Sequence, residues 1–147
     1  MKSLIMSAAV LFAAFTSCQS GNTDNADTNA STPPQDVTQS KQISADVTVD
    51  EFEKGIQGED VIVLDVRKPD EYAQGHIANA RLMNIYDGDF NEQLKTLDAK
   101  KPVYVYCRSG GRSGNAKNIM KQMGFAEVYN LRGGMMAWSG SGKAVSK

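Results

Sequence analysis

The chain is poor in the side chains that bind metals or form disulfide frameworks. Its 147 residues include two cysteines and one histidine, and their spacing matches no metal-ligand pattern. We therefore expect no metal ion and no cofactor. The chain also lacks an excess of charge of one sign, because 16 basic and 17 acidic side chains give a net charge of -1. No basic field is present that would attract nucleic acid.

The apolar run near the N-terminus is too short to cross a membrane. It extends from Leu4 to Phe15, about 12 residues, whereas a membrane-spanning helix needs about 20. Lys2 precedes it and "TSC" follows, as in a secretory signal. The segment "FTSC" resembles a bacterial lipobox, which implies that residues 1–18 are a lipoprotein leader and that Cys18 is acylated. An ordinary secretory signal and a cytosolic hydrophobic N-terminus are the alternatives. We expect a protein anchored by lipid in a bacterial cell envelope, facing the periplasm or the exterior.

Residues 19–45 contain almost no large apolar side chains. Such a segment buries too little surface to offset the entropy of ordering it, so we expect a disordered polar linker before a globular domain at residues 46–147. If Cys18 carries lipid it cannot form a disulfide, and Cys107 is a lone thiol in an exported protein, which indicates reactivity. A disulfide between the two is the alternative.

Within residues 46–147, short apolar runs alternate with helical patterns. The apolar runs predict strands at 61–67, 80–85, 102–107 and 126–131. Helices are predicted from near residue 49 (with capping-box spacing of Thr48 and Glu51), at 69–74, at 89–97 (with the same spacing of Asp89 and Glu92), at 112–123 and as a final turn at 133–138. This alternation predicts a parallel α/β sheet.

Two polar segments follow predicted strands, at residues 65–67 and 107–112. Ligand sites of open α/β sheets lie beyond the carboxyl ends of the strands, so we expect the site there. The second segment belongs to "YCRSGGRSG", in which the three glycines Gly110, Gly111 and Gly114 permit positive φ values and Arg108 and Arg112 supply charge. A nest of backbone N–H groups around the sulfur would lower the pKa of Cys107 and would also stabilise a persulfide. A buried structural cysteine is the alternative.

Three segments together resemble the single-domain rhodaneses. They are "DVRKPDEYAQGHIANA" (65–80), "YCRSGGRS" (106–113) and "NLRGGMMAW" (130–138), and the resemblance covers residues 46–138. It implies a rhodanese-like α/β fold with a five-stranded parallel sheet flanked by helices. Asn79 departs from the pattern, which usually has glycine there. Asparagine tolerates the left-handed region, so we expect the turn to survive.

The resemblance also implies a sulfurtransferase reaction. Cys107 would take sulfane sulfur from a donor such as thiosulfate, form a persulfide and pass the sulfur to cyanide or a thiol, with ping-pong kinetics. Arg108 would bind the anionic donor, Arg112 would close the loop around the extra sulfur, and Ser113 would hydrogen-bond near the thiolate. The stabilising backbone amides would be those of Ser109, Gly110, Gly111 and Arg112.

Further residues are expected to support this site. Asp65, Arg67, Glu71 and His76 would brace the surrounding loops, with Arg67 reaching the active-site region. The group of Gly133, Gly134 and Trp138 is expected to pack and close the sheet, with Met135 or Met136 at an apolar rim of the pocket.

Other functions stay open at this point. Phosphatase or arsenate reductase activity is one, but the loop from Cys107 to Arg112 is one residue shorter than that of the phosphatases that share this fold. A sulfur carrier or redox relay with a protein partner at the membrane is another. A non-catalytic binding module is the weakest, because the cysteine is retained. We expect a monomer.

Overall fold

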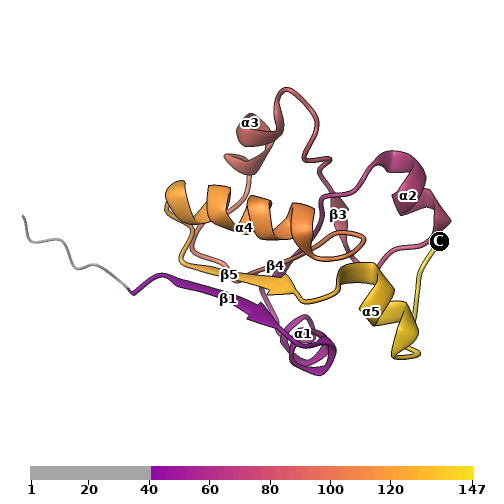
Figure 1. The fold of residues 1–147 in the computed structure, drawn as a ribbon. Helices are drawn as coiled ribbons and strands as arrows, with labels where there is room; N and C mark the ends of the chain where they lie inside the picture. The colour runs from indigo at the N-terminus through magenta and orange to yellow at the C-terminus, as the bar shows by residue number, and fades with distance from the viewer. Residues whose placement is uncertain (1–40) are drawn as a thin grey trace, which may run out of the picture. The chain divides into compact units, whose positions relative to one another are not determined.

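A five-stranded parallel sheet forms the framework of the structure, a computed structural model that describes residues 41–147 (Figure 1). The strands are β1 (Ile43–Val47), β2 (Ile62–Asp65), β3 (Arg81–Leu82), β4 (Val103–Tyr106) and β5 (Glu127–Leu131). Their order is β1-β5-β4-β2-β3, and every neighbouring pair is parallel. The helices are α1 (Val49–Gly55), α2 (Pro69–Gln74), α3 (Phe90–Leu94), α4 (Gly111–Gln122) and α5 (Gly134–Gly140). The predicted architecture of a five-stranded parallel sheet flanked by helices is confirmed.

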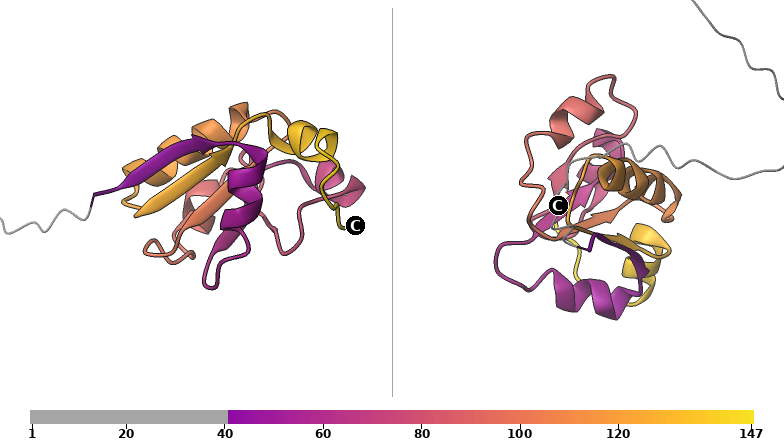
Figure 2. Two further views of the ribbon diagram at one scale, coloured as in Figure 1. Left: turned by 90° about the horizontal axis from the view of Figure 1, so that it is seen from below. Right: turned by 90° about the vertical axis from the view of Figure 1, so that its left-hand side faces the viewer.

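Helices cover both faces of the sheet, as Figure 2 shows from two further directions. Successive residues of a strand point to opposite faces. In β2, Leu64 packs with residues of α3 and α4, whereas Val63 packs with residues of α1 and α5. Both faces are therefore apolar, which explains why the central strands read as continuous apolar runs.

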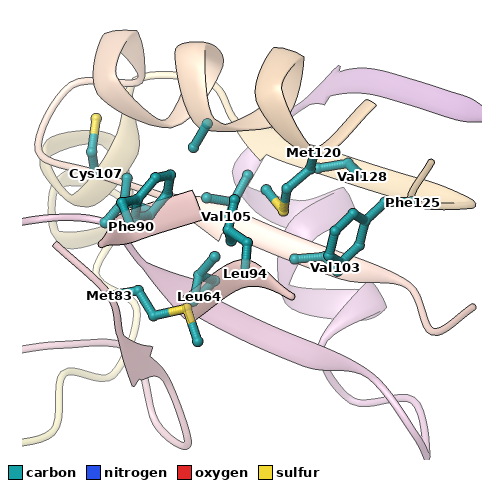
Figure 3. Close-up of a cluster of buried hydrophobic side chains, with 12 residues drawn as sticks. Leu64, Met83, Phe90, Leu94, Val103, Val105, Cys107, Met120, Phe125 and Val128 are labelled. Atoms are coloured by element: carbon teal, nitrogen blue, oxygen red, sulfur yellow. The ribbon is translucent and has the colours of Figure 1, made fainter. Parts of the chain in front are cut away.

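The larger of the two hydrophobic clusters lies between the sheet and helices α3 and α4 (Figure 3). Its buried members are Leu64, Val66, Met83, Phe90, Leu94, Val103, Val105, Cys107, Ala116, Met120, Phe125 and Val128. Cys107 lies at one end of this cluster in Figure 3, so the thiol is held by the core on one side.

Local signals in the sequence explain several element boundaries. The predicted capping box is confirmed, because the Thr48 hydroxyl accepts from the Glu51 amide and the Glu51 carboxylate accepts from the Thr48 amide. Asn79 has the expected positive φ, at 61°. Helix α4 buries the side chains of Ala116 and Met120, two of the four apolar positions predicted to face inward.

Three predictions about the elements need correction. Strand β1 begins at Ile43, so residues 43–45 belong to the sheet and not to a disordered linker. The alternating sequence "ISADV" suits a half-exposed edge strand and lacks a continuous apolar run. The strand predicted at 80–85 shrinks to two residues of β3. Asp89 does not cap α3 with its side chain, which instead accepts from Gln93 Nε2 at 2.9 Å.

The predicted leader, Cys18 and residues 19–40 of the predicted linker lie outside the described residues. Within residues 41–147, no helix is long and apolar enough to span a membrane.

Candidate active site

The candidate active site is the loop that joins β4 to α4. β4 ends at Tyr106, Cys107 follows, and α4 begins at Gly111. Because β4 is the middle strand of the sheet, the thiol lies at the carboxyl end of the strand that is most enclosed. The first turn of α4, which carries the positive end of the helix dipole, follows directly. Cys107 is a free thiol, and 1% of its surface is exposed.

The sulfur of Cys107 faces hydrogen-bond donors although it is buried. The Gly110 amide donates to Sγ at 3.2 Å, and the Ser113 hydroxyl donates to it at 3.4 Å. Burial by itself raises the pKa of the Cys107 thiol. The Ser113 hydroxyl and the amides of Ser113, Ser109 and Gly110 outweigh that effect and hold the pKa below its ordinary value. This environment favours a thiolate.

The expected ring of amides is only partly formed around this sulfur. The amides of Ser109 and Gly110 act on it, and that of Ser113 adds to them. Within residues 41–147 no hydrogen bond runs from the Gly111 or Arg112 amide to Sγ. The sulfur thus depends on fewer amides than expected, and the Ser113 side chain carries more of the stabilisation.

Gly110 gives the loop its shape. Its φ of 95° lies in the left-handed region, and a Cβ atom there would come within 3.2 Å of Gly133 N and 3.3 Å of Leu131 O. The other two glycines expected to need positive φ, Gly111 and Gly114, are instead ordinary residues of α4. One glycine of the loop is therefore required by conformation and close packing together.

The start of α5 holds the backbone of the β4–α4 loop. The Met135 amide donates to the Cys107 carbonyl at 2.8 Å, and the Met136 amide donates to the Arg108 carbonyl at 3.0 Å. Gly134 has a φ of 56°, and a Cβ atom there would collide with the Cys107 carbonyl oxygen and the Arg108 backbone. The segment expected to pack and close the sheet thus also positions the loop.

The Arg112 guanidinium is paired with an acidic residue of α2. Its Nη1 and Nη2 donate to the two carboxylate oxygens of Glu71, each at 2.7 Å. This pairing lowers the pKa of Glu71 to about 2 and raises the pKa of Arg112. The guanidinium also lies 6.0 Å from the ring centre of Tyr86. In the structure Arg112 therefore joins the loop to α2, and its expected role in closing the loop around the extra sulfur of a persulfide stays a prediction.

Arg108 is the exposed cation beside the thiol. Within residues 41–147 its side chain makes no hydrogen bond or ion pair. It borders a cavity of about 580 Å³, lined by Arg67, Asp70, Glu71, Gln74, Gly75, Arg108, Met135, Met136, Ser139 and Val145. It also borders a second cavity of about 550 Å³, together with Lys68, Tyr86 and Arg112. Met135 and Met136 both line the first cavity, where an apolar rim was expected.

Asp65 and Arg67 form a buried ion pair beneath this cavity. Arg67 Nη2 lies 2.6 Å from Asp65 Oδ2 and also donates to the Gly75 carbonyl at 2.8 Å. The neighbouring Tyr106 hydroxyl accepts from the Ile77 amide at 3.0 Å, and burial raises the pKa of Tyr106. These hydrogen bonds connect the ends of β2 and β4 to residues 75–77, which follow α2.

His76 lies with its ring stacked on Tyr72, 3.8 Å between ring centres. Its Nδ1 is 3.2 Å from the Tyr72 carbonyl oxygen, and its backbone pairs with Ser146. These contacts are structural. Within the part of the chain that the structure describes, no three His, Cys, Asp or Glu side chains are grouped as metal ligands.

Two parts of the site were not predicted from the sequence. Asn130 donates to the Gly110 carbonyl at 3.3 Å, and the C-terminal Val145 forms one wall of the larger cavity. Asn130 lies within a quoted motif, but nothing in its neighbours indicates which loop it contacts. Val145 lies beyond the last motif and carries no signal.

Comparisons with known proteins agree with this geometry. The family model described as a rhodanese-like domain matches residues 48–141. The chain belongs to the rhodanese-like family. It is 38% identical over 87 residues to a sulfurtransferase of Allochromatium vinosum, covering 59% of this chain and 79% of that one. It is 36% identical over 83 residues to a thiosulfate sulfurtransferase of Coxiella burnetii, covering 56% of this chain and 76% of that one.

A solved structure supports the same assignment. The crystal structure of a rhodanese-related protein from Thermoplasma volcanium superimposes with a TM-score of 0.62 at 30% identity, covering 69% of this chain and 97% of that one. The rhodanese-like domain of this chain therefore shares both sequence and fold with proteins that include named sulfurtransferases.

Proposed function

We propose that the domain is a sulfurtransferase that carries sulfane sulfur as a persulfide on Cys107. The observation that carries this proposal is the sulfur environment: donors from Gly110 and Ser113 point at a thiol whose pKa lies below its ordinary value. The same donors suit the outer sulfur of a persulfide, which is also an anion at neutral pH. A buried cysteine with a purely structural role would not need them.

The first half of the reaction loads the sulfur. The Cys107 thiolate attacks the outer sulfur of a donor such as thiosulfate, forming a new S–S bond. The S–S bond of thiosulfate breaks, and its electron pair leaves on sulfite. Arg108 binds the anionic donor, because it is the exposed cation next to the thiol and faces the larger cavity.

The second half unloads the sulfur. Cyanide or a thiolate attacks the outer sulfur of the persulfide, and the electron pair of that S–S bond returns to Cys107 as thiolate. No external oxidant or reductant is consumed, so the cycle closes on the donor and acceptor alone. Because Cys107 is 1% exposed, the side chain or the loop has to shift toward the cavity in each half-reaction.

A protein acceptor is the second candidate, and one surface feature favours it. Large exposed hydrophobic side chains gather around the cavities that Arg108 borders: Met136 is 61% exposed, Tyr86 65% and Val145 43%. Apolar groups around a reactive thiol suit the surface of a protein partner better than cyanide. Faster transfer to a reduced protein dithiol than to cyanide, lost in Met136→Glu, would favour a relay role.

The decisive test of the proposal is chemical. We expect thiosulfate to add one sulfur atom to the protein in intact mass spectrometry, with peptide mapping placing it on Cys107 and not on Cys18. Cys107→Ser should lose both this mass increase and the transfer of sulfur to cyanide, whereas Asn118→Ala, an exposed change on α4, should keep both. Equal activity in Cys107→Ser would refute the proposal, and a phosphoryl adduct from a phosphate ester would support the phosphatase alternative.

We also propose that the domain works at a bacterial cell envelope, held there by lipid on Cys18. The support is the arrangement of a positive residue, an apolar run and "FTSC" ahead of the polar linker. Such a tether would concentrate the domain at the membrane, close to partners there.

A further inference from the structure

More hydrogen-bond donors surround the Gly110 carbonyl oxygen than it has lone pairs. The Gly114 amide donates to it at 2.9 Å, Asn130 Nδ2 lies at 3.3 Å and the Ser113 hydroxyl at 3.2 Å. A carbonyl oxygen has two lone pairs, so two of these three donors fill it. The Gly114 and Asn130 N–H groups satisfy that requirement without Ser113.

The Ser113 hydroxyl faces the opposite situation, with one proton and two acceptors. Its oxygen lies 3.2 Å from the Gly110 carbonyl oxygen and 3.4 Å from Cys107 Sγ. Ser113 is fully buried, so water cannot supply a further donor or acceptor. Which acceptor receives the proton therefore depends on whether the Gly110 carbonyl is already filled.

We propose that Asn130 is a positioning residue that directs the Ser113 hydroxyl proton to Cys107 Sγ. The Asn130 amide occupies the second lone pair of the Gly110 carbonyl oxygen. The Ser113 hydroxyl is then left with Cys107 Sγ as its available acceptor. A hydrogen bond to a thiolate is charge-assisted and stronger than one to a neutral carbonyl. Asn130 thus acts on the thiolate without touching it.

The surroundings of Asn130 fix the orientation that this role needs. Its second N–H donates to Asp46 Oδ1 at 2.9 Å, and Lys117 Nζ contacts the same carboxylate oxygen at 2.7 Å. The hydrogen bonds from Lys117 and Asn130 lower the pKa of Asp46, so it stays ionised. Turning the amide over would place its oxygen against both the Asp46 carboxylate and the Gly110 carbonyl, which repel it.

One further observation agrees with an amide held by its N–H groups. Asn130 Oδ1 is buried, and within the described residues it has no hydrogen-bond partner. Buried polar atoms are rarely left unpaired, because they lose their hydrogen bonds to water without replacement. The Asn130 side chain therefore keeps both N–H hydrogen bonds, while its Oδ1 atom remains without a hydrogen-bond donor.

The test is a double-mutant cycle read by the rate at which iodoacetamide alkylates Cys107 at pH 6. This readout needs no sulfur donor, so its outcome does not depend on the proposed sulfurtransferase reaction. We expect Asn130→Ala to slow alkylation on the order of fivefold, the size of one weakened hydrogen bond to an anion. In a Ser113→Ala background the same change should alter the alkylation rate less than twofold, because alanine has no hydroxyl group whose hydrogen bond could be redirected.

Two outcomes would overturn the proposal: no slowing by Asn130→Ala, or equal slowing with and without the Ser113 hydroxyl. Asn130→Leu, which fills a similar volume, takes the place of Asn130→Ala if the smaller side chain prevents folding, and the cycle is read in the same way. Asn118→Ala, on the exposed face of α4, should leave the rate unchanged. Arg112, whose charge also acts on Cys107, stays constant in every arm.

Discussion

Glu71 in α2 and Arg112 at the start of α4 are joined by two hydrogen bonds of 2.7 Å, although 41 residues separate them in the chain. Both side chains are about four-fifths buried, with 22% of the Glu71 side chain and 20% of the Arg112 side chain exposed. The pair connects the β4–α4 loop to α2, which forms one wall of the larger cavity. It therefore contributes both to stability and to the position of α2.

Glu71→Gln should destabilise the domain by about 1 to 2 kcal/mol at pH 7, since a two-point charge-assisted contact is lost at a partly screened site. The pKa of Glu71 is lowered from 4.5 to about 2 in the folded protein. A lowered carboxyl pKa stabilises the fold above pH 4.5, and this stability is lost as the pH falls from 4.5 toward 2. Urea unfolding at pH 7 and pH 3 should therefore show the difference between wild type and variant shrinking in acid.

Glu92→Gln is the matched control for this measurement. Glu92 pairs with Lys95 at 2.6 Å, but both side chains are more than half exposed. Such surface pairs contribute little, so we expect a change below about 0.5 kcal/mol. A Glu71→Gln difference that persisted unchanged to pH 3 would show that the ion pair is not its source.

Arg108→Ala should weaken donor binding without disturbing the thiol. Its side chain is exposed and makes no hydrogen bond within residues 41–147, so the melting temperature and the alkylation rate of Cys107 should stay close to wild type. The KM for thiosulfate should rise roughly tenfold, since one charge-assisted contact to the anion is lost. Steady-state kinetics against Lys100→Ala, an exposed charge elsewhere, would check this. An unchanged KM would remove Arg108 from the donor site.

Gly134→Ala should damage the loop far more than an ordinary glycine substitution. The positive φ and the collision with the Cys107 and Arg108 backbone together cost about 2 kcal/mol or more. Gly140→Ala, in the same helix with open space around it, should be neutral or stabilise by up to about 1 kcal/mol. Thermal unfolding of both variants distinguishes them, and equal melting temperatures would contradict the close packing of α5 against the loop.

Cys18→Ala should release the protein from membranes if lipid on this residue is the anchor. The expression host should be a bacterium that processes lipoproteins. The expected result is wild type in the membrane fraction and the variant in the soluble fraction, with no change in the melting temperature of the domain. A variant that stays with the membranes would exclude Cys18 as the sole anchor.

The sheet and the position of the thiol could be predicted because their signals are local. The strands β2 and β4 are continuous apolar runs, and the glycines and arginines after Cys107 sit next to it in the chain. β1 was missed because an edge strand buries few of its side chains. It is recognised by its pairing with β5, some eighty residues away, which no local pattern contains.

The fine structure of the site could not be predicted for a related reason. The bond from Asn130 to the Gly110 carbonyl, the Glu71–Arg112 pair and the wall formed by Val145 each join segments distant in sequence. The residue types indicate which side chains are able to interact, but not which of them lie close together in the fold. Arg112 illustrates this, since an arginine in the loop suits an anion, yet its Nη1 and Nη2 groups both donate to the Glu71 carboxylate of α2.

The central claim is that the β4–α4 loop stabilises a thiolate at position 107. The most direct measurement is the pH dependence of Cys107 alkylation by iodoacetamide, with Cys18 replaced by alanine so that one thiol reacts. Our account predicts a midpoint below the value of about 8.5 for an ordinary cysteine, moving upward in Ser113→Ala. A midpoint at or above 8.5, unaffected by Ser113→Ala, would contradict it.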